Sequence, residues 1–259
     1  MPSRFYTHAR AFLKATRCVA HLLSGMLTIA RFFSKATAEQ KAQHIAQWAN
    51  DFLHILGVQV RTTGSAVTTG PLLVVANHIS WLDILVMLAV QPVRFVSKAD
   101  IKHWPLIGWL ATNVGTLYIE RASRRDALRV VHHIAEALRE APAGTPVHTA
   151  SIIAVFPEGT TGDGTTVLPF HANLVQAAIS AHAPVQPVAL RYQDAATGAL
   201  SLVPAYIDDD TLISSVWRLL ASPAVQAVVH FSEVQHADGR DRRAWALDLR
   251  GDVSKSLGA

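Results

Sequence analysis

The sequence is poor in the residues that build covalent cross-links and metal clusters. Its 259 residues include a single cysteine, Cys18, so the chain holds no internal disulfide and no zinc or iron–sulfur cluster ligated by cysteines. Charged residues are also scarce, at 16% against about 25% in typical soluble domains. Because half of the residues are hydrophobic, a disordered or fibrous chain is excluded and a large packed core is expected.

Two common motifs of catalytic loops are missing as well. The chain has no G-x-S-x-G segment, the turn that exposes the nucleophilic serine of many hydrolases. Gly159 and Gly164 have the separation found in a nucleotide-binding P-loop, but Thr165 stands where that motif requires lysine. Neither a hydrolase built on that turn nor a P-loop nucleotidase is therefore expected.

Positive charge is concentrated at the N-terminus. Residues 1–50 hold seven Lys and Arg residues and one acidic residue, a balance of +6, whereas the rest of the chain has a balance of −2. No nucleic-acid-binding motif and no basic face with interleaved aromatic residues accompanies this charge, so nucleic acid is not an expected partner. A membrane surface with anionic lipids is the partner that the pattern favours.

The longest uncharged segment near the N-terminus is residues 18–30. Its thirteen residues would make a helix of about 20 Å, too short to cross the roughly 30 Å of bilayer hydrocarbon. Arg31 and Lys35 follow directly, and no small-x-small cleavage site lies between, so removal as a signal peptide is not expected. We expect a helix that lies in the membrane interface. An ordinary helix buried against the main domain is the alternative.

A second helical pattern runs from Thr37 to Leu56 and stops at Gly57. With the first segment it predicts a two-helix hairpin, so we expect residues 1–56 to bind the membrane and residues 57–259 to form the catalytic domain. The protein should then lie on the cytoplasmic face of the cell inner membrane as a peripheral or monotopic protein.

From Val58 onward, short apolar runs alternate with helical patterns. This alternation predicts an α/β fold with a largely parallel sheet flanked by helices, in which loops at the carboxyl ends of strands carry the chemistry. The expected strands are Val58–Thr62, Leu72–Ala76, Val93–Ser97, Gly115–Ile119, Ile152–Phe156, Val185–Arg191, Ser201–Pro204 and Ala227–Ser232. The expected helices are Leu82–Ala89, Pro105–Thr112, Arg124–Glu140, Ala172–Ala181, Thr211–Leu220 and Arg242–Ser256, with a surface loop at Glu140–Ser151.

The segment ANHISWLD, residues 76–83, follows an apolar strand and opens a helix. Four residues separate His78 from Asp83, so a turn from strand into helix can bring the carboxylate to the imidazole, orient it and leave the other ring nitrogen free as a base. The pair is half of a serine-hydrolase triad. A serine-type lipid esterase would have to use Ser80, but Ser80 is so close to His78 in sequence that its place in front of the ring does not follow from the motif. If the hydroxyl belongs to the substrate instead, the protein is a transferase.

Two further blocks carry polar residues at strand ends. In VGTLYIERAS, residues 114–123, Arg121 offers a planar cation suited to phosphate or carboxylate, although a surface ion pair explains it equally well. In VFPEGTTGDG, residues 155–164, Glu158 and Gly159 enter a loop whose backbone amides could face an anion, with a simple turn as the alternative. A fourth block, residues 184–192, is a strand with Pro187, which is typical of an edge or a bulge.

In this order, the four blocks resemble the glycerolipid acyltransferase family, typified by the bacterial 1-acylglycerol-3-phosphate O-acyltransferases and including lysophospholipid acyltransferase-like proteins. The resemblance covers roughly residues 57–235, and its most specific parts are the His-x4-Asp and Phe-Pro-Glu-Gly-Thr blocks. The matching residues are Asn77, His78, Asp83, Gly115, Arg121, Phe156, Pro157, Glu158, Gly159, Thr160, Val185, Pro187 and Val188, and the connection KHWPLIGW that begins with Lys98 is also similar.

The resemblance implies an enzyme that transfers a fatty acyl group from acyl-CoA or acyl-carrier protein to the free hydroxyl of a lysolipid. His78 would act as the base and Asp83 would orient it, while substrate binding would fall to Arg121, Glu158, Gly159, Thr160 and Lys98. Neither a metal, nor a cofactor other than the acyl donor, nor a covalent acyl-enzyme is implied.

The leading acceptor implied by the resemblance is 1-acylglycerol-3-phosphate. Lyso-ornithine lipid is the alternative, because Thr161 stands where the family commonly has arginine. A non-catalytic membrane-binding module is a further reading, which the His78 and Asp83 pair opposes.

Overall fold

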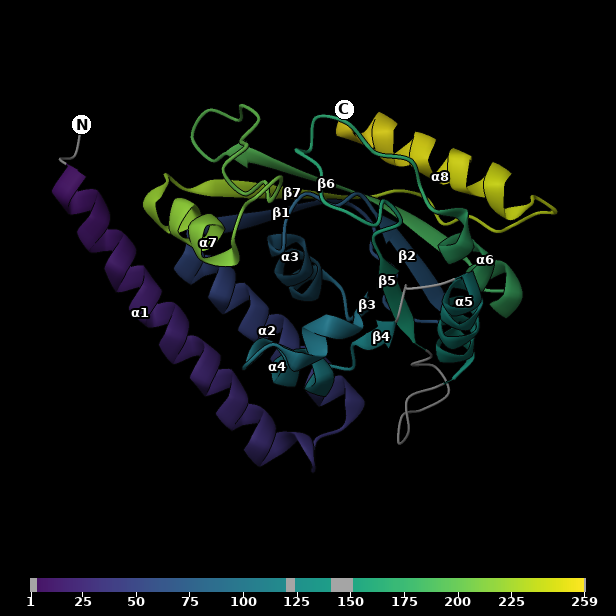
Figure 1. Cartoon of the computed structure of the whole chain (residues 1–259), viewed down its shortest axis with the longest axis horizontal. Coiled ribbons are helices and arrows are strands. Elements are labelled where there is room, and N and C mark those ends of the chain that lie inside the picture. Colours follow the sequence, from purple (N-terminus) through teal and green to yellow (C-terminus); the bar gives the residue numbers. More distant parts are fainter. Residues whose placement is uncertain (1–3, 120–123, 141–150, 259) are drawn as a thin grey trace.

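The computed structural model describes residues 4–119, 124–140 and 151–258. These residues form a seven-stranded sheet in the order β1-β7-β6-β2-β5-β3-β4, with helices on both of its faces (Figure 1). The strands are β1 (Val58–Gly64), β2 (Leu72–Ala76), β3 (Arg94–Lys98), β4 (Leu117–Ile119), β5 (Ile152–Val155), β6 (Val185–Asp194) and β7 (Val225–Phe231). The helices are α1 (Arg4–Thr28), η1 (Ile29–Phe33), α2 (Ala38–Leu56), α3 (Leu82–Val90), η2 (Ala99–His103), α4 (Ile107–Asn113), α5 (Arg124–Arg139), α6 (Ala172–Ala181), α7 (Leu212–Ala221) and α8 (Arg242–Leu257). The predicted α/β fold class is confirmed.

The strand directions bring the polar segments to one edge of the sheet. Neighbouring strands are parallel except β6 and β7, so β1 and β7 run opposite to the other strands. Val75 of β2 pairs with Val155 of β5, and Phe95 of β3 pairs with Ala154. The segments that follow β2 and β5 therefore leave the sheet side by side, where a parallel sheet collects its functional loops.

The core lies in two layers, one on each face of the sheet. Leu72, Val74 and Ala76 of β2 join a cluster with buried residues of α1, α2, α3 and α7, while Leu73 and Val75 join a second cluster with α5, α6 and α8. Successive side chains of a strand point to opposite faces, so a strand buried on both faces is apolar throughout. The continuous apolar sequence of β2 follows from this position.

The first two helices are an antiparallel pair packed on the domain. Trp48 Nε1 of α2 donates to the carbonyl oxygen of His21 of α1 at 3.2 Å, and Lys14 Nζ donates to the carbonyl oxygen of Leu56 at 3.2 Å. Helix α1 begins well before the uncharged segment 18–30, so Lys14 lies within the helix rather than in a flank. Helix α2 ends at Gly57, in the left-handed conformation with φ of 86°. The membrane-binding role of this pair and the division at residue 56 stay predictions.

No helix in the described part of the chain combines the length and the apolar character that crossing a bilayer requires.

One expectation about the strands is wrong. Ser201–Pro204 forms no strand: Ser201 N donates to the carbonyl oxygen of Tyr192 and Ala205 N to that of Leu202, so the chain turns, and Pro204 has no N–H to extend a ladder. Pro187 does not lie on an edge strand, since β6 is an interior strand. It lies where the antiparallel register shifts by one residue, between the bridge of Val185 with Gln235 and the pair of Val188 with Phe231. Pro187 is tolerated there because antiparallel pairing with β7 begins one residue later, at Val188.

Candidate active site

The end of β2 brings the histidine and the aspartate of the first motif together. The chain leaves β2 at Ala76 and enters α3 at Leu82, and His78 Nδ1 lies 2.8 Å from Asp83 Oδ2. Because a carboxylate oxygen can only accept, Nδ1 carries the proton and Nε2 is left with its lone pair. The His78 side chain is 19% exposed and that of Asp83 is fully buried, so the base can meet a ligand and its partner cannot.

Asp83 is held by four hydrogen bonds. Besides His78, its Oδ2 accepts from the backbone N–H groups of Ile79 at 2.7 Å and Ser80 at 2.9 Å, and its Oδ1 accepts from the hydroxyl of Tyr192 at 2.7 Å. Burial, followed by the charge of Asp83, raises the pKa of Tyr192 well above its ordinary value, so the phenol stays protonated and donates. A buried carboxylate with every partner in place is fixed in position.

Two aromatic rings support the imidazole. The His78 ring is stacked on Phe156, with centroids 4.0 Å apart and an interplanar angle of 7°. Phe156 is stacked in turn on Phe95 of β3, with centroids 5.6 Å apart. The plane of the imidazole is therefore set by segments that follow or belong to three neighbouring strands.

Both carboxylate oxygens of Glu158 accept hydrogen bonds from the protein backbone, whereas the predicted role in binding the substrate would direct them to the lipid head group. Its Oε1 accepts from the backbone N–H of His78 at 2.7 Å, and its Oε2 accepts from that of Leu168 at 2.9 Å. The side chain is buried, and this burial raises its pKa although both hydrogen bonds act to lower it. Gly162 N donates to the carbonyl oxygen of His78 at 2.8 Å. The loop after β5 thus holds the backbone of His78 from both sides.

The other predicted binding residues are Gly159, Thr160, Lys98 and Arg121. Gly159 follows Glu158 with φ of 74°, in the left-handed region that favours glycine, and the next residue, Thr160, is exposed. Lys98 is exposed at the end of β3, three residues beyond Phe95. Arg121 lies outside the described residues. The structure therefore brings Glu158 to the pair and says nothing about Arg121.

Ser80 has no access to solvent. Its side chain is fully buried, and its Oγ accepts a hydrogen bond from the backbone N–H of Leu82 at 3.3 Å. A serine nucleophile must be reachable by the substrate and lie before the base. The geometry therefore opposes an esterase that uses Ser80.

Two contributions of β6 escaped prediction from the sequence. Tyr192 holds Asp83, and Asn77 exchanges two hydrogen bonds with the backbone of Leu190, at 2.9 Å from Nδ2 and 2.7 Å to Oδ1. Asn77 belongs to the first motif, whereas no local sequence pattern marks Tyr192 as the partner of Asp83. Only the pairing of β2 with β6 brings Tyr192 to Asp83.

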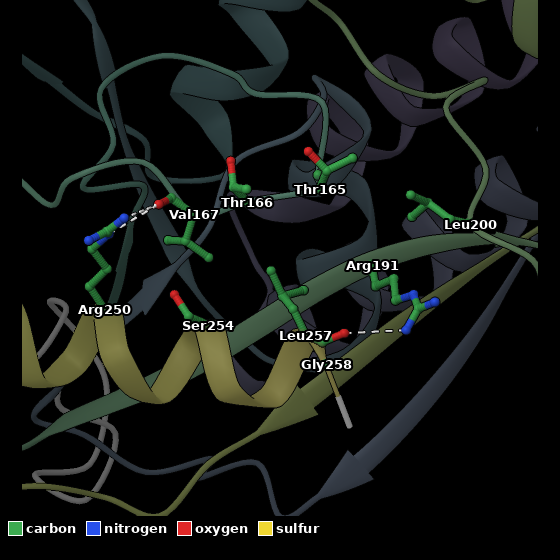
Figure 2. Close-up of a pocket in the computed structure, with 10 residues that line it drawn as sticks. Thr165, Thr166, Val167, Arg191, Leu200, Arg250, Ser254, Leu257 and Gly258 are labelled. Atoms are coloured by element: carbon green, nitrogen blue, oxygen red, sulfur yellow. Dashed lines mark hydrogen bonds between the residues drawn. The ribbon is translucent and has the colours of Figure 1, made fainter.

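A cavity of about 570 Å³ lies beside the loop after β5 and is lined by residues of that loop, β6 and α8 (Figure 2). Arg250 of α8 donates to the carbonyl oxygens of Val167 and Leu168, and Arg191 of β6 donates to that of Leu257 at 3.3 Å. His78 and Asp83 are not among its lining residues. Because Leu168 is the residue whose N–H is held by Glu158, Arg250 supports the far side of the same loop.

Among the described residues, no cluster of three or more His, Cys, Asp or Glu side chains is placed to hold a metal ion.

Comparisons with known proteins identify the family of the chain. A sequence model of the acyltransferase family matches residues 57–191. The chain is 36% identical to the lyso-ornithine lipid O-acyltransferase of Pseudomonas aeruginosa, over 81% of this chain and 76% of that one. It is 38% identical to the 1-acyl-sn-glycerol-3-phosphate acyltransferase of Neisseria gonorrhoeae, over 72% and 68% of the two chains.

A solved structure shares the fold. The crystal structure of the 1-acyl-sn-glycerophosphate acyltransferase PlsC from Thermotoga maritima superposes with a TM-score of 0.68, over 98% of this chain and 94% of that one, at 19% identity. At that identity the likeness establishes the fold and not the substrate. The family match over residues 57–191 and the two relatives establish the rest: this chain belongs to the acyltransferase family and is an O-acyltransferase of lipid biosynthesis.

Proposed function

We propose that the protein transfers a fatty acyl group from the thioester of acyl-CoA or acyl-carrier protein to the free hydroxyl of a lysolipid at a membrane surface. The observation that carries the proposal is the His78 imidazole, partly exposed and tied through Nδ1 to a buried, fully bonded Asp83. An imidazole held in this way presents Nε2 as a base, and Ser80, the serine of the same motif, is buried and cannot serve as the nucleophile. The attacking hydroxyl therefore comes from the acceptor.

The reaction balances without a further reactant. Nε2 of His78 removes the proton of the acceptor hydroxyl as its oxygen attacks the thioester carbonyl carbon, so that a C–O bond forms. The tetrahedral intermediate collapses with cleavage of the C–S bond, and the imidazolium returns the proton to the leaving thiolate. Asp83 stabilises the imidazolium between the two transfers. General-base catalysis of this kind contributes about 10²–10⁴ to the rate.

The leading acceptor is 1-acylglycerol-3-phosphate. The name of the Neisseria relative supports it, as do two cations, Lys98 and Arg121, that could bind a phosphate. Glu158, which the backbone of His78 and Leu168 engages, is proposed as a positioning residue, with the neighbouring Gly159 and Thr160 as contacts for the acceptor.

Lyso-ornithine lipid is the second candidate acceptor. It is supported by the name of the Pseudomonas relative and by Thr161, which stands where the family commonly has arginine. The Thr161 hydroxyl donates to the carbonyl oxygen of Tyr206, so the position supplies no cation to a phosphate.

The membrane part of the proposal is supported by the outer face of α1. Ala11 and Cys18 are buried against the domain, as an ordinary packed helix requires. The opposite face is nevertheless apolar and exposed; its large residues, continued by Phe32 of η1, are Phe12, Leu13, Val19, Leu23 and Leu27. The exposed bases Arg10, Arg17 and Arg31 accompany this face. Such a surface fits the anionic, cytoplasmic leaflet of the inner membrane, with the protein peripheral or monotopic.

A paired acceptor assay tests the proposal. Purified protein in detergent micelles is given radiolabelled acyl-CoA or acyl-carrier protein, with 1-acylglycerol-3-phosphate or lyso-ornithine lipid as acceptor. His78→Ala tests the base, and His133→Ala, an exposed histidine of α5, is the matched control. Phosphatidate formed by the unaltered and His133→Ala proteins, and lost in His78→Ala, is the expected result. If product forms from lyso-ornithine lipid alone, that lipid is the acceptor. Full turnover by His78→Ala overturns the mechanism.

A further inference from the structure

Helix α7 presents an exposed apolar face that adjoins α1. Ile213 is 82% exposed and Trp217 is 39% exposed, and their spacing of four residues places them on one face of the helix. The Trp217 ring is stacked with the ring of His8 on α1, with centroids 6.1 Å apart and an interplanar angle of 14°. Phe12, one turn further along α1 from His8, is 69% exposed. The two helices therefore share one apolar surface, and Figure 1 shows α7 beside α1.

The inner face of the same helix contacts the catalytic segment. Ser215 is buried, and its Oγ accepts a hydrogen bond from Trp81 Nε1 at 3.1 Å. Trp81 stands between His78 and Asp83 in the sequence. Helix α7 thus contacts α1 with one face and the segment that carries His78 with the other.

The chemistry of this surface fits a lipid bilayer. A single exposed isoleucine is ordinary on a protein surface. Ile213, Trp217 and the outer face of α1 instead form a contiguous apolar surface, and such surfaces mark sites of interaction. Tryptophan is favoured at the boundary between lipid headgroups and acyl chains, where its ring is buried and its N–H stays hydrated. The exposed bases Arg10 and Arg17 of α1 complement anionic headgroups.

The acidic residues near α7 show that this helix cannot attract an anionic bilayer through its charge. Asp208 and Asp209 are exposed just before α7, while Asp210 is paired with Arg218 at 2.7 Å. The two free carboxylates would repel anionic headgroups. The attraction of α7 to a bilayer therefore comes from its apolar side chains, and the electrostatic attraction comes from α1.

We propose that α7 is a third membrane-contacting helix, which seats Ile213 and Trp217 in the bilayer interface beside α1 and holds the catalytic segment at the lipid surface. The proposal rests on the proposed function, because it extends the same membrane contact from the N-terminal helices to a helix that lies between β6 and β7. It commits to lipid as the occupant, and a second copy of the chain or an acyl-carrier protein on this face is the competing outcome.

Site-directed labelling tests the contact in the full chain. An environment-sensitive fluorophore is attached at Ile213→Cys, at Leu23→Cys on the outer face of α1, and at Leu247→Cys. Leu247 is the matched control, since it is 66% exposed on α8, on the other side of the molecule from α1 (Figure 1). Burial raises the pKa of Cys18 to about 11, so the native thiol reacts little at neutral pH, and the unaltered protein carried through labelling measures that background.

Each labelled protein is mixed with vesicles of phosphatidylethanolamine and phosphatidylglycerol that contain a lipid-borne quencher. A blue shift and quenching at positions 213 and 23, with neither at 247, is the expected result. Quenching at 23 with none at 213 overturns the role of α7 and leaves the membrane proposal standing. No quenching at 23 or 213 overturns both, and a spectral change at 213 without vesicles that grows with protein concentration assigns the face to a second copy.

A second variant gives an independent measurement. Ile213→Glu is expected to weaken partitioning onto the same vesicles by about tenfold, because an exposed isoleucine loses its transfer into the interface. Leu247→Glu should partition like the unaltered protein. The activity of Ile213→Glu should fall further on vesicles than in detergent micelles. Equal partitioning of Ile213→Glu and Leu247→Glu would exclude lipid as the occupant. So would recovery of the activity of Ile213→Glu when acyl-carrier protein is added.

Discussion

The hydroxyl of Tyr192 lies 2.7 Å from Oδ1 of Asp83, on the carboxylate oxygen that His78 does not use. The two oxygens of Asp83 therefore have separate tasks. Oδ2 holds the imidazole and the turn into α3, and Oδ1 ties the carboxylate to β6 in the middle of the sheet. The orientation of the base is thus set by an interior strand of the sheet and not by its own loop alone.

Tyr192→Phe should weaken this arrangement without removing the base. The substitution keeps the ring but leaves Oδ1 of a buried carboxylate without its donor, which costs about 1–3 kcal/mol of stability. If the same loss is felt when the imidazolium forms, kcat falls about tenfold. Thermal unfolding and steady-state kinetics on the same preparation measure both effects. Tyr118→Phe, a partly exposed tyrosine of β4, is the control, and equal kinetics for the two variants would separate Tyr192 from catalysis.

Asp83→Asn should be far more damaging than its small change in shape implies. An asparagine with its amide oxygen at the Oδ2 position turns its NH₂ group to the Tyr192 hydroxyl. With the oxygen at the Oδ1 position, the NH₂ group faces His78 Nδ1 and favours the wrong tautomer of the ring. In both arrangements the negative charge that stabilises the imidazolium is lost. We expect kcat to fall by about 10²–10⁴, with the KM for the acceptor little changed, because Asp83 is buried away from ligands. A loss of less than tenfold, with the fold shown intact by circular dichroism, would contradict the assignment of Asp83 as the residue that orients the base.

Glu158 predicts a pH dependence of stability. Burial raises its folded-state pKa above the ordinary value of 4.5, so the folded protein binds the proton more tightly than the unfolded chain does. This contribution is fully present below the unfolded pKa and is lost as pH rises through the raised folded pKa. The stability of the unaltered protein relative to Glu158→Gln should therefore decline as pH rises above 4.5 and then become constant.

The same variant tests the positioning role of Glu158. A glutamine has one carbonyl oxygen, so it can accept from His78 N or from Leu168 N but not from both, and an unsatisfied buried N–H costs about 1–3 kcal/mol. Melting temperatures measured from about pH 4 to about pH 8 follow the titration. Glu136→Gln, an exposed glutamate of α5, should show no such trend. A difference between Glu158→Gln and the unaltered protein that does not vary with pH would rule out this titration.

The sequence predicts the parts of the site that lie within one segment and misses those that depend on strand order. Only four residues separate His78 from Asp83, so a turn from strand into helix suffices to join them, and the fold confirms that contact. Glu158 is found by its place at the end of an apolar strand, but its contact with the amide of His78 follows only from the pairing of β2 with β5. Tyr192 has no local signal at all.

The same distinction applies to the fold. The apolar runs of β2, β5 and β6 are long or uniform enough to identify as buried strands, and the sequence patterns locate the α-helices from α2 onward to within a few residues. Helix α1, however, begins at Arg4, well before the uncharged segment that predicts it. Ser201–Pro204 has the apolar composition of a strand but forms a turn, closed by the hydrogen bond from Ala205 N to the carbonyl oxygen of Leu202. The isolated bridge beside it joins Leu200, just before the segment, to Gln193. The reversed direction of β7 depends on which neighbour it meets in the sheet, which no short pattern encodes.

The bond between Trp81 and Ser215 should couple α7 to the catalytic segment. Trp81→Phe removes the indole donor and Ser215→Ala removes the acceptor, and each should lower the activity on lipid vesicles by several-fold, because the segment between His78 and Asp83 loses its tie to α7. If the two residues act through this bond, the double variant is little worse than either single one, and the coupling energy is about 0.5–3 kcal/mol. The measurement is a double-mutant cycle of kcat/KM, run on vesicles and again in detergent micelles. Losses that add in both media would show that the two residues contribute separately to packing and that α7 does not position the base through Trp81.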